Sequence, residues 1–304
     1  METYAFSNAM SKSMKRKSMN RPILYMQFIL AVLATLLLGA QLVPAEASPD
    51  NRIKVPLSDP SRPAHVRAHL VSGSITVKAA DTKEIIVEGH VRGRQEGDED
   101  EVKPEGRLHR IPMTSTGLSV EADSDNNDVR ISADSTRRAV DLIITVPVHT
   151  SLSLHTVNGG NIKVSGVDGE LDVNDVNGEV ELTNISGSAV AHALNGKVLV
   201  TFNRVDAKKP MAFSSLNGAI DVTFPPDIKA NLSMRTDNGE VYSDFDIQLQ
   251  ATSAPPTVED NRGKGGKYVV RIEKTVRGTI NGGGQEIQFK NFNGNIYIRK
   301  TGGK

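Results

Sequence analysis

Four acidic residues fall on alternate positions of two short segments, Glu170 and Asp172 in one and Glu179 and Glu181 in the next. Paired carboxylates could act as general acid and base in glycoside hydrolysis, as in the β-helical enzymes that cleave polysaccharides in a groove on one sheet. No His or Arg joins them at matching positions. We therefore interpret them as weak surface candidates that cluster on a solvated strand face, and predict no catalytic residue and no enzyme.

Two other patterns match metal sites only in part. Residues 123–128 are acidic and Asp134 stands at the twelfth position, but the calcium loop between two helices needs Gly at position six and Glu at twelve. His65 and His69 lack the intervening Glu of the helical zinc motif, and on a strand they lie about 13 Å apart. We expect an acidic loop, surface histidines, and no metal or cofactor.

Composition excludes further classes of chemistry. The chain has no cysteine, which excludes disulfides and thiolate catalysis. It has no Gly-x-Ser-x-Gly motif, and the glycines at 282–284 are not followed by the Lys-Ser/Thr of a phosphate loop. With 36 basic and 36 acidic residues, the net charge of zero gives no reason to expect a nucleic-acid partner.

The four acidic residues belong to a sequence repeat that is densest at 155–199. Dipeptides ending in glycine occur there at steps of 10, 9, 9 and 9 residues, each followed by a short alternating run. Asn-Gly takes every second place and recurs after steps of 19, 18, 22 and 21 residues, so one full turn has about 20 residues and two short strands. The predicted corner positions are Asn158, Gly159, Asn177, Gly178, Asn195, Gly196, Asn217, Gly218, Asn238, Gly239, Asn293 and Gly294.

Side-chain parity favours a coil over hairpins. In a two-residue hairpin the residues that flank the turn share one face. Here those pairs would combine Val176 with Glu179 and Leu194 with Lys197, an apolar residue with a polar one. We predict an all-β fold, a single-stranded right-handed β-solenoid (β-helix). A three-residue loop would change the parity, so an antiparallel β-sandwich or meander is the alternative.

In the coil, the second and fourth residues after each corner glycine point inward. Asparagine recurs at one corner because it tolerates positive φ and its amide can bond the neighbouring turn, so we expect the asparagines to stack in a ladder. The core would consist of Val, Ile, Leu and Ala, and the segment 139–146 is expected to be a fully buried strand. The inward pairs are Leu171/Val173, Val180/Leu182, Ala189/Ala191, Val198/Val200, Ile220/Val222, Val241/Ser243 and Ile296/Ile298.

The N-terminus has the pattern of an export signal. A basic start precedes the apolar run 23–43, and Ala45 and Ala47 suit a signal peptidase that cuts before Ser48. We predict a signal peptide at 1–47 and an exported protein, periplasmic, cell-surface or secreted, with no stable membrane span after cleavage. The alternative is an uncleaved N-terminal helix that anchors the chain.

Further boundaries follow from composition. We assign 48–63 to a linker or entry cap and 64–304 to one β-strand-repeat domain. Within this domain we expect an N-terminal cap and first turns at 64–150, regular repeats at 151–247, an irregular loop at 248–267 and C-terminal turns at 268–304.

The phrases LSLHTVNGGNIKVSGV, GELDVNDVNGEVEL and LNGAIDVTFP resemble the bacterial putative adhesin family of β-strand repeats, a domain of unknown function. The resemblance covers roughly residues 64 to 300. It implies an extracytoplasmic β-helix-like domain and brings no catalytic residues.

Three functions follow as hypotheses. The first is a non-enzymatic adhesin or envelope scaffold that binds an envelope glycan, cell wall or protein. The second is a carbohydrate-active enzyme that uses an acidic groove. The third is an envelope-stress sensing domain, for which the sequence offers only the compartment. The sequence favours the first and gives no oligomeric state.

Overall fold

The structure is a computed structural model that describes residues 52–92, 118–122, 126–133, 138–250, 257–260, 268–271 and 275–302. These residues contain strands and no helix, which confirms the all-β class. Twenty strands form one mixed sheet, and β18 (Thr257–Asp260) and β19 (Tyr268–Arg271) form a separate antiparallel pair. The signal segment 1–47, Ser48 and Asp134 lie outside the described residues, as do residues 123–125 of the acidic loop.

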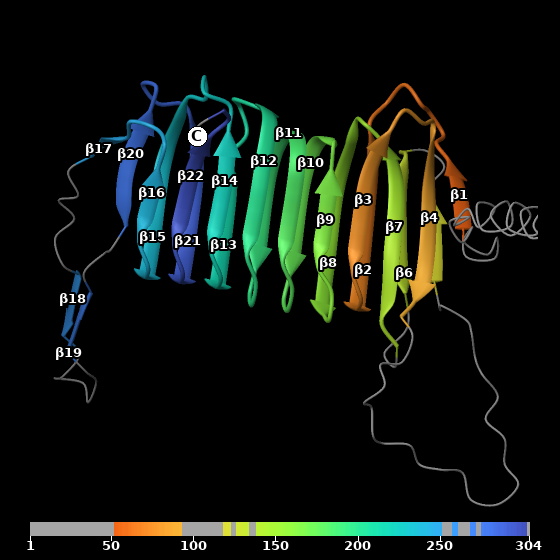
Figure 1. Ribbon diagram of the computed structural model, residues 1–304, viewed down its shortest axis with the longest axis horizontal. Coiled ribbons are helices and arrows are strands. Elements are labelled where there is room, and N and C mark those ends of the chain that lie inside the picture. Colours follow the sequence, from red (N-terminus) through yellow and green to blue (C-terminus); the bar gives the residue numbers. More distant parts are fainter. Residues whose placement is uncertain are drawn as a thin grey trace, which may run out of the picture. The chain divides into compact units, whose positions relative to one another are not determined.

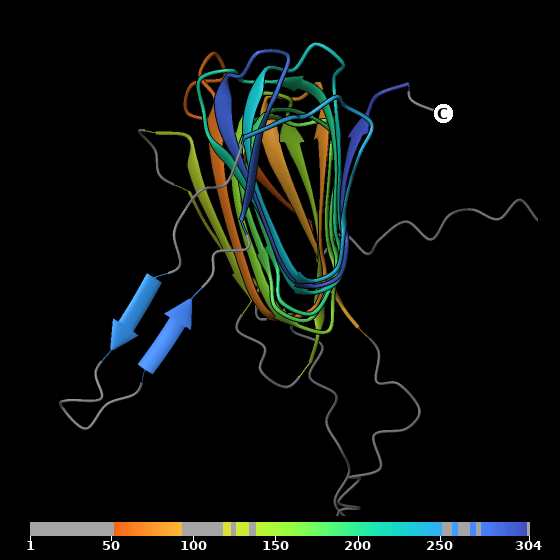
Figure 2. The ribbon, with the colours of Figure 1, turned by 90° about the vertical axis from the view of Figure 1, so that its left-hand side faces the viewer.

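The large sheet consists of two rows of strands, which Figure 2 shows end-on as two facing layers. In spatial order the first row holds β5 (Leu118–Ala122), β6 (Asp128–Ala133), β2 (Ala64–Ser72), β8 (Thr150–Asn158), β10 (Asp168–Asp175), the C-terminal half of β11 (Val180–Ala193), β13 (Met211–Asn217), β21 (Gln285–Asn293), β15 (Ala230–Asn238), β20 (Val276–Ile280) and β17 (Gln248–Leu249). The second row holds β1 (Arg52–Pro56), β4 (Glu84–Val91), β7 (Val140–Pro147), β3 (Ile75–Ala80), β9 (Ile162–Ser165), the N-terminal half of β11, β12 (Val198–Val205), β14 (Ile220–Phe224), β22 (Ile296–Lys300) and β16 (Val241–Ser243).

Within each row the central strands pair in parallel. From β6 to β15 in the first row, and from β7 to β16 in the second, every pairing is parallel. Antiparallel strands occur at the row ends, where β5, β4 and β1 lie at one end and β20 and β17 at the other. An Asn-Gly corner therefore joins a first-row strand to a second-row strand and closes no hairpin. We call one such pair of strands a repeat.

The repeats do not follow one another in chain order. The repeat β2/β3 lies between β6/β7 and β8/β9, and β21/β22 lies between β13/β14 and β15/β16 (Figure 1). The chain thus inserts an early repeat and its last repeat between others, which the sequence pattern does not predict.

The core lies between the rows and matches the expected inward positions with one exception. Every side chain of the seven predicted inward pairs is buried except Val241, which is 36% exposed, and Ser243. Both belong to β16, the last strand of the second row, which has a partner on one side only among the described strands.

Two expectations about the core are wrong in detail. The segment 139–146 is not fully buried, because β7 alternates buried residues with half-buried ones such as Asp141 and Thr145. Aromatic residues also contribute to the core, since four buried phenylalanines pack together across the rows. Their closest pairs, with ring centroids 5.4 Å apart, are Phe202 with Phe224 and Phe213 with Phe289.

Candidate ligand-binding face

The outer side of the first row carries Arg, His, Ser, Asp and Asn side chains at its centre, and we call it the β10 face. Because the strands are in register, equivalent residues form columns that run across the repeats. One column contains Arg67, Ser153, Asp172 and Val190, and the next contains His69, His155, Asn174 and His192. Neighbouring members of a column stand on strands about 4.8 Å apart.

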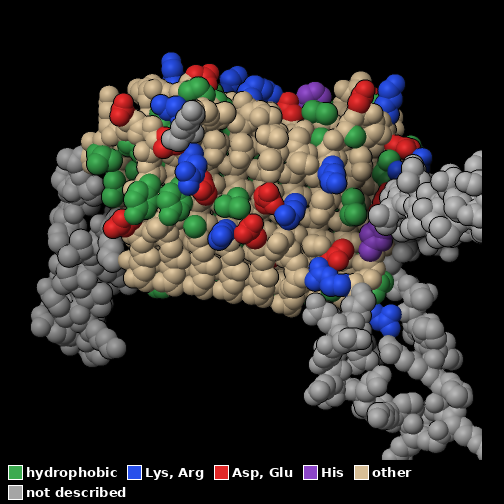
Figure 3. All heavy atoms as spheres, in the orientation of Figure 1, with side chains coloured by type: hydrophobic (Ala, Val, Ile, Leu, Met, Phe, Trp, Pro, Cys, Tyr) green, Lys and Arg blue, Asp and Glu red, His purple; other side chains and the backbone are tan. Residues whose placement is uncertain are grey.

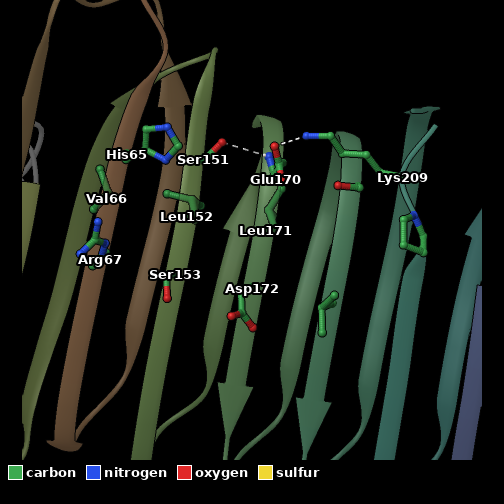
Figure 4. A pocket seen from close by; sticks show the side chains of 13 residues that line it. His65, Val66, Arg67, Ser151, Leu152, Ser153, Glu170, Leu171, Asp172 and Lys209 are labelled. Carbon is green, nitrogen blue, oxygen red and sulfur yellow. Dashed lines mark hydrogen bonds and ion pairs between the residues drawn. The ribbon is translucent and has the colours of Figure 1, made fainter. Parts of the chain in front are cut away.

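A shallow hollow of about 460 Å³ crosses this face over β2, β8, β10 and β11 and ends at Lys209 (Figure 4). His65, Arg67, Ser153, Glu170 and Asp172 line it. A second hollow of about 350 Å³ adjoins it over β6, β2 and β8, and the two share Arg67 and Ser153. The two hollows lie side by side across the strands, the direction in which the repeats follow one another, and we call them together the groove.

Charged groups in this groove are paired but accessible. Lys209 forms an ion pair with Glu170, whose side chain is 62% exposed. The backbone N–H of Glu170 donates to Ser151 Oγ at 3.2 Å. Arg67 contacts Asp128 at 2.5 Å. Because both side chains of the Lys209–Glu170 pair are exposed, this pair contributes little to stability and can exchange its partner for a ligand at low cost. In the other pair Arg67 is 51% exposed and Asp128 only 19%.

The histidines of the second column each contact a neighbouring strand. His69 and His155 stack with ring centroids 4.9 Å apart and planes 4° from parallel. Burial lowers the pKa of His155, and the neighbouring His69 lowers it further. His192 Nδ1 lies 2.7 Å from Ser214 Oγ, and burial together with Lys290 lowers the pKa of His192. At neutral pH His155 and His192 are therefore uncharged and can donate or accept hydrogen bonds.

The structure separates the four acidic residues that the sequence grouped. Glu170 and Asp172 lie together on β10 in the groove. Glu181 lies on the N-terminal half of β11 in the second row, where it pairs with Lys163 at 2.7 Å, and Glu179 lies at the preceding corner. The expected single acidic cluster is therefore wrong, because each corner moves the chain from one row to the other.

The Asn-Gly corners form a continuous ladder along one edge of the rows. Asn177 Nδ2 donates to Asn158 Oδ1 at 3.0 Å, and Asn195 donates to Asn177 at 2.9 Å. The ladder continues from Asn217 to Asn195, from Asn293 to Asn217 and from Asn238 to Asn293, each at 2.8 Å. The lower edge in Figure 3, to which these corners belong, shows few charged side chains over most of its length.

Of the two reasons expected for asparagine at these corners, the structure shows amide bonding between turns and not the positive φ. None of the ladder asparagines has a positive φ; among the described non-glycine residues only Asn127, Asn184 and Asn281 do. The side-chain amide bonds of the ladder account for asparagine. Close stacking accounts for glycine, because a Cβ on Gly196 would lie 1.9 Å from the carbonyl oxygen of Gly178.

Sequence reasoning missed the basic residues of the groove and gave its histidines no more than a surface role. Arg67 is far from the dense repeat in sequence, and only the parallel register places it in one column with Asp172, two strands away. Lys209 follows the dense repeat and contacts Glu170 across the stacked repeats. Sequence reasoning also missed Tyr242 and Tyr297, which stack on the second row with centroids 5.3 Å apart. Their equal offset from Gly239 and Gly294 was the available signal.

The two sequence patterns that partly match metal sites lie only in part within the described residues. Those residues contain no group of three or more His, Asp or Glu side chains arranged to hold a metal ion. His65 and His69 both lie on β2, as the strand prediction requires, and His69 contacts His155 instead. No helix within the described residues is long and apolar enough to cross a membrane, and the apolar run 23–43 lies outside them.

No family model matches this chain, and no curated protein sequence is similar to it. Two solved structures are similar in part. A putative cell adhesion protein from Clostridium sporogenes ATCC 15579 aligns with 82% of this chain and 98% of its own, at 12% identity and a TM-score of 0.33. A putative adhesin from Bacteroides fragilis NCTC 9343 aligns with 82% of this chain and 95% of its own, at 12% identity and a TM-score of 0.31. At these scores the fold and function have to be argued from the chain itself.

Proposed function

We propose that this protein is an exported, non-enzymatic adhesin or envelope scaffold that binds an envelope glycan along the groove of the β10 face. The observation that carries the proposal is the register of the groove. Polar residues stand at equivalent positions of β2, β8 and β10. The two columns that they form, from Arg67 and from His69, both continue onto β11. A polymer laid across the strands meets one residue of each column about every 4.8 Å. A repeating ligand suits such a repeating surface.

The chemistry of the groove fits a glycan better than a strongly charged polymer. Ser151 and Ser153, two residues apart on β8, supply hydroxyl groups. Arg67 supplies a positive charge and Asp172 a negative one. Val190 is 44% exposed at the end of this column and offers an apolar contact. Sugars carry hydroxyl groups and apolar C–H faces, so they can use all three kinds of group.

A binding role is favoured over hydrolysis. Glu170 and Asp172 stand two residues apart on one strand, about 6.6 Å along it, which alone would suit a pair of catalytic carboxylates. A general acid, however, needs an environment that keeps its carboxyl protonated. Glu170 is exposed and paired with Lys209, and Asp172 is exposed. We therefore propose that these carboxylates accept hydrogen bonds from ligand hydroxyls.

Export and the coil are parts of the same proposal. The basic start, the apolar run and the Ala45–Ala47 site support cleavage before Ser48. Parallel pairing in both rows supports a β-solenoid, and the usual hand of parallel crossovers supports a right-handed one. N-terminal sequencing of protein recovered from the envelope would contradict cleavage if the chain began at or before residue 47.

Affinity capture tests the binding proposal. The purified protein is immobilised and exposed to solubilised envelope polysaccharides, and the bound fraction is measured for wild type, Ser153→Trp and Thr201→Trp. Ser153 is exposed where the two hollows meet, so the indole should obstruct the groove. Thr201 is half-buried on the outer side of the second row and serves as the matched control.

We expect binding by wild type and by Thr201→Trp, and at least a tenfold weaker binding by Ser153→Trp. Equal binding by Ser153→Trp would remove the groove as the site. A wild-type protein that binds no envelope polysaccharide would remove the function. Cleavage of the bound polymer that Glu170→Gln/Asp172→Asn abolishes would replace binding with catalysis.

A further inference from the structure

Polar side chains that face inward form a column directly beneath the Asn-Gly corners. Thr156 Oγ1 donates to the carbonyl oxygen of Gly73 at 3.0 Å, and Ser215 Oγ donates to that of Gly196 at 2.9 Å. Asn291 does the same to Gly218 at 2.8 Å and Thr236 to Gly294 at 3.0 Å. In each of these repeats an uncharged donor binds the corner glycine of the neighbouring repeat.

Asp175 occupies this position in β10. Its register partners are Thr156 on β8 and Ala193 on β11, and Ala193 is in turn opposite Ser215. The corner glycine of the β8/β9 repeat that it faces is Gly160. A Cβ placed on Gly178 would lie 1.9 Å from the Gly160 carbonyl oxygen and 2.6 Å from Asp175 Oδ2, so both oxygens crowd the same point.

The carboxyl group has no countercharge. Asp175 is fully buried, and among the described residues it is the only ionisable side chain that is. Neither of its oxygens has a hydrogen-bond partner of ordinary distance and angle. The backbone N–H of Asn177 still favours the charged form, but less than burial disfavours it. On the neighbouring strands it is flanked by Thr156 and Ala193, which are uncharged. The adjacent residues of those strands, His155 and His192, are ionisable but point to the outer face. A carboxylate here would face a carbonyl oxygen with nothing to neutralise it.

We propose that Asp175 is a neutral carboxylic acid in the folded protein and donates its proton in a hydrogen bond to the Gly160 carbonyl oxygen. When Asp175 releases that proton to solvent, the stacking of the β8/β9 and β10/β11 repeats becomes weaker. The protonated Asp175 fills the donor place that Thr156, Ser215, Asn291 and Thr236 fill elsewhere. The site is a proton-binding site in the core that makes the stability of the repeats depend on pH.

The direction of this dependence follows from linkage. Burial raises the pKa of Asp175 from 3.8 to about 7, against a smaller lowering by the backbone N–H of Asn177. Between these two values the folded protein holds a proton that the unfolded chain has released. The contribution of Asp175 to stability is therefore greatest below about pH 3.8 and declines as the pH rises to about 7.

The test compares wild type with Asp175→Asn, whose amide supplies the donor without a titratable proton, as Asn291 does in its own repeat. Denaturant unfolding is measured from about pH 5 to pH 9. The titrations of His155 and His192 occur in both proteins and cancel in the difference. Asp172→Asn, exposed on the same strand, is the matched control.

We expect the unfolding equilibrium constant of wild type, relative to Asp175→Asn, to rise by up to about tenfold per pH unit as the pH approaches 7 and then to level off. The constant of Asp172→Asn relative to wild type should lack this rise, since that variant keeps the buried carboxyl group. Carboxyl ¹³C NMR of wild type gives an independent readout if Asp175→Asn does not fold. A protonated Asp175 at about pH 5 supports the proposal, whereas a carboxylate at that pH, or a difference that does not vary with pH, would overturn it.

Discussion

Asn293 Nδ2 donates a hydrogen bond to Asn217 Oδ1 at 2.8 Å, although 76 residues separate the two along the chain. The same Asn293 accepts a bond from Asn238, which precedes it by 55 residues. The last repeat in sequence, β21/β22, is therefore an internal repeat of the stack, with β13/β14 on one side and β15/β16 on the other. Its insertion separates two repeats that follow each other in the sequence.

This insertion predicts the effect of removing the C-terminus. A chain that ends at residue 284 loses β21 and β22, and with them the only parallel partners of β15 and β16 among the described strands. We expect amide hydrogen exchange in β13 to β16 to become fast while β2, β8 and β10 remain protected. If β15 and β16 kept their protection, the insertion would be contradicted.

The ladder predicts a measurable cost for one asparagine. Asn195 donates to Asn177 and accepts from Asn217, so Asn195→Ala removes two hydrogen bonds. We expect the free energy of unfolding to fall by about 1–2 kcal/mol, measured by denaturant titration. Asn174→Ala is the control, since Asn174 is on the β10 face outside the ladder. An equal loss in both variants would show that the ladder contributes nothing of its own.

The corner glycines predict a larger cost than the asparagines. Gly196→Ala would place its Cβ 1.9 Å from the Gly178 carbonyl oxygen, so the two repeats must separate. Gly282 has φ +83° and open space around its Cβ position, so Gly282→Ala should cost only the strain of that φ, about 1–2 kcal/mol. For Gly196→Ala the midpoint temperature of thermal unfolding should be well below that of Gly282→Ala. The reverse order would refute the close stacking.

The histidine column predicts a second pH dependence, opposite in sign to that of Asp175. The pKa values of His155 and His192 are lowered in the folded protein, chiefly by burial. Their contribution to stability is present above about pH 6.5 and is lost as the pH falls, because the unfolded chain then binds protons more readily. In the Asp175→Asn background we expect stability to fall from pH 7 to pH 5, and His155→Gln/His192→Gln to flatten the curve. A curve that keeps its slope in that variant would assign the titration to other groups.

The sequence predicts much of the local structure and little of the site. The alternation after each glycine identifies which residues of β10, β12 and β14 are buried, because it depends only on strand geometry. It fails at Val241, since burial there depends on whether another strand follows β16. It cannot place Lys209 beside Glu170, because that pair depends on the register between distant strands. It also groups Glu179 and Glu181 with Glu170, because the repeat pattern does not show that each corner moves the chain to the other row.

The central claim is that the groove binds a polymer laid across the strands, and the most direct measurement is affinity against ligand length. Oligomers of the captured polysaccharide are separated by size, and each is titrated against the purified protein by calorimetry. We predict that affinity rises with each added sugar until the oligomer spans the groove from β6 to β11 and then levels off, and that Ser153→Trp removes the rise. An affinity that does not depend on length, or a rise that Ser153→Trp leaves unchanged, would contradict the claim.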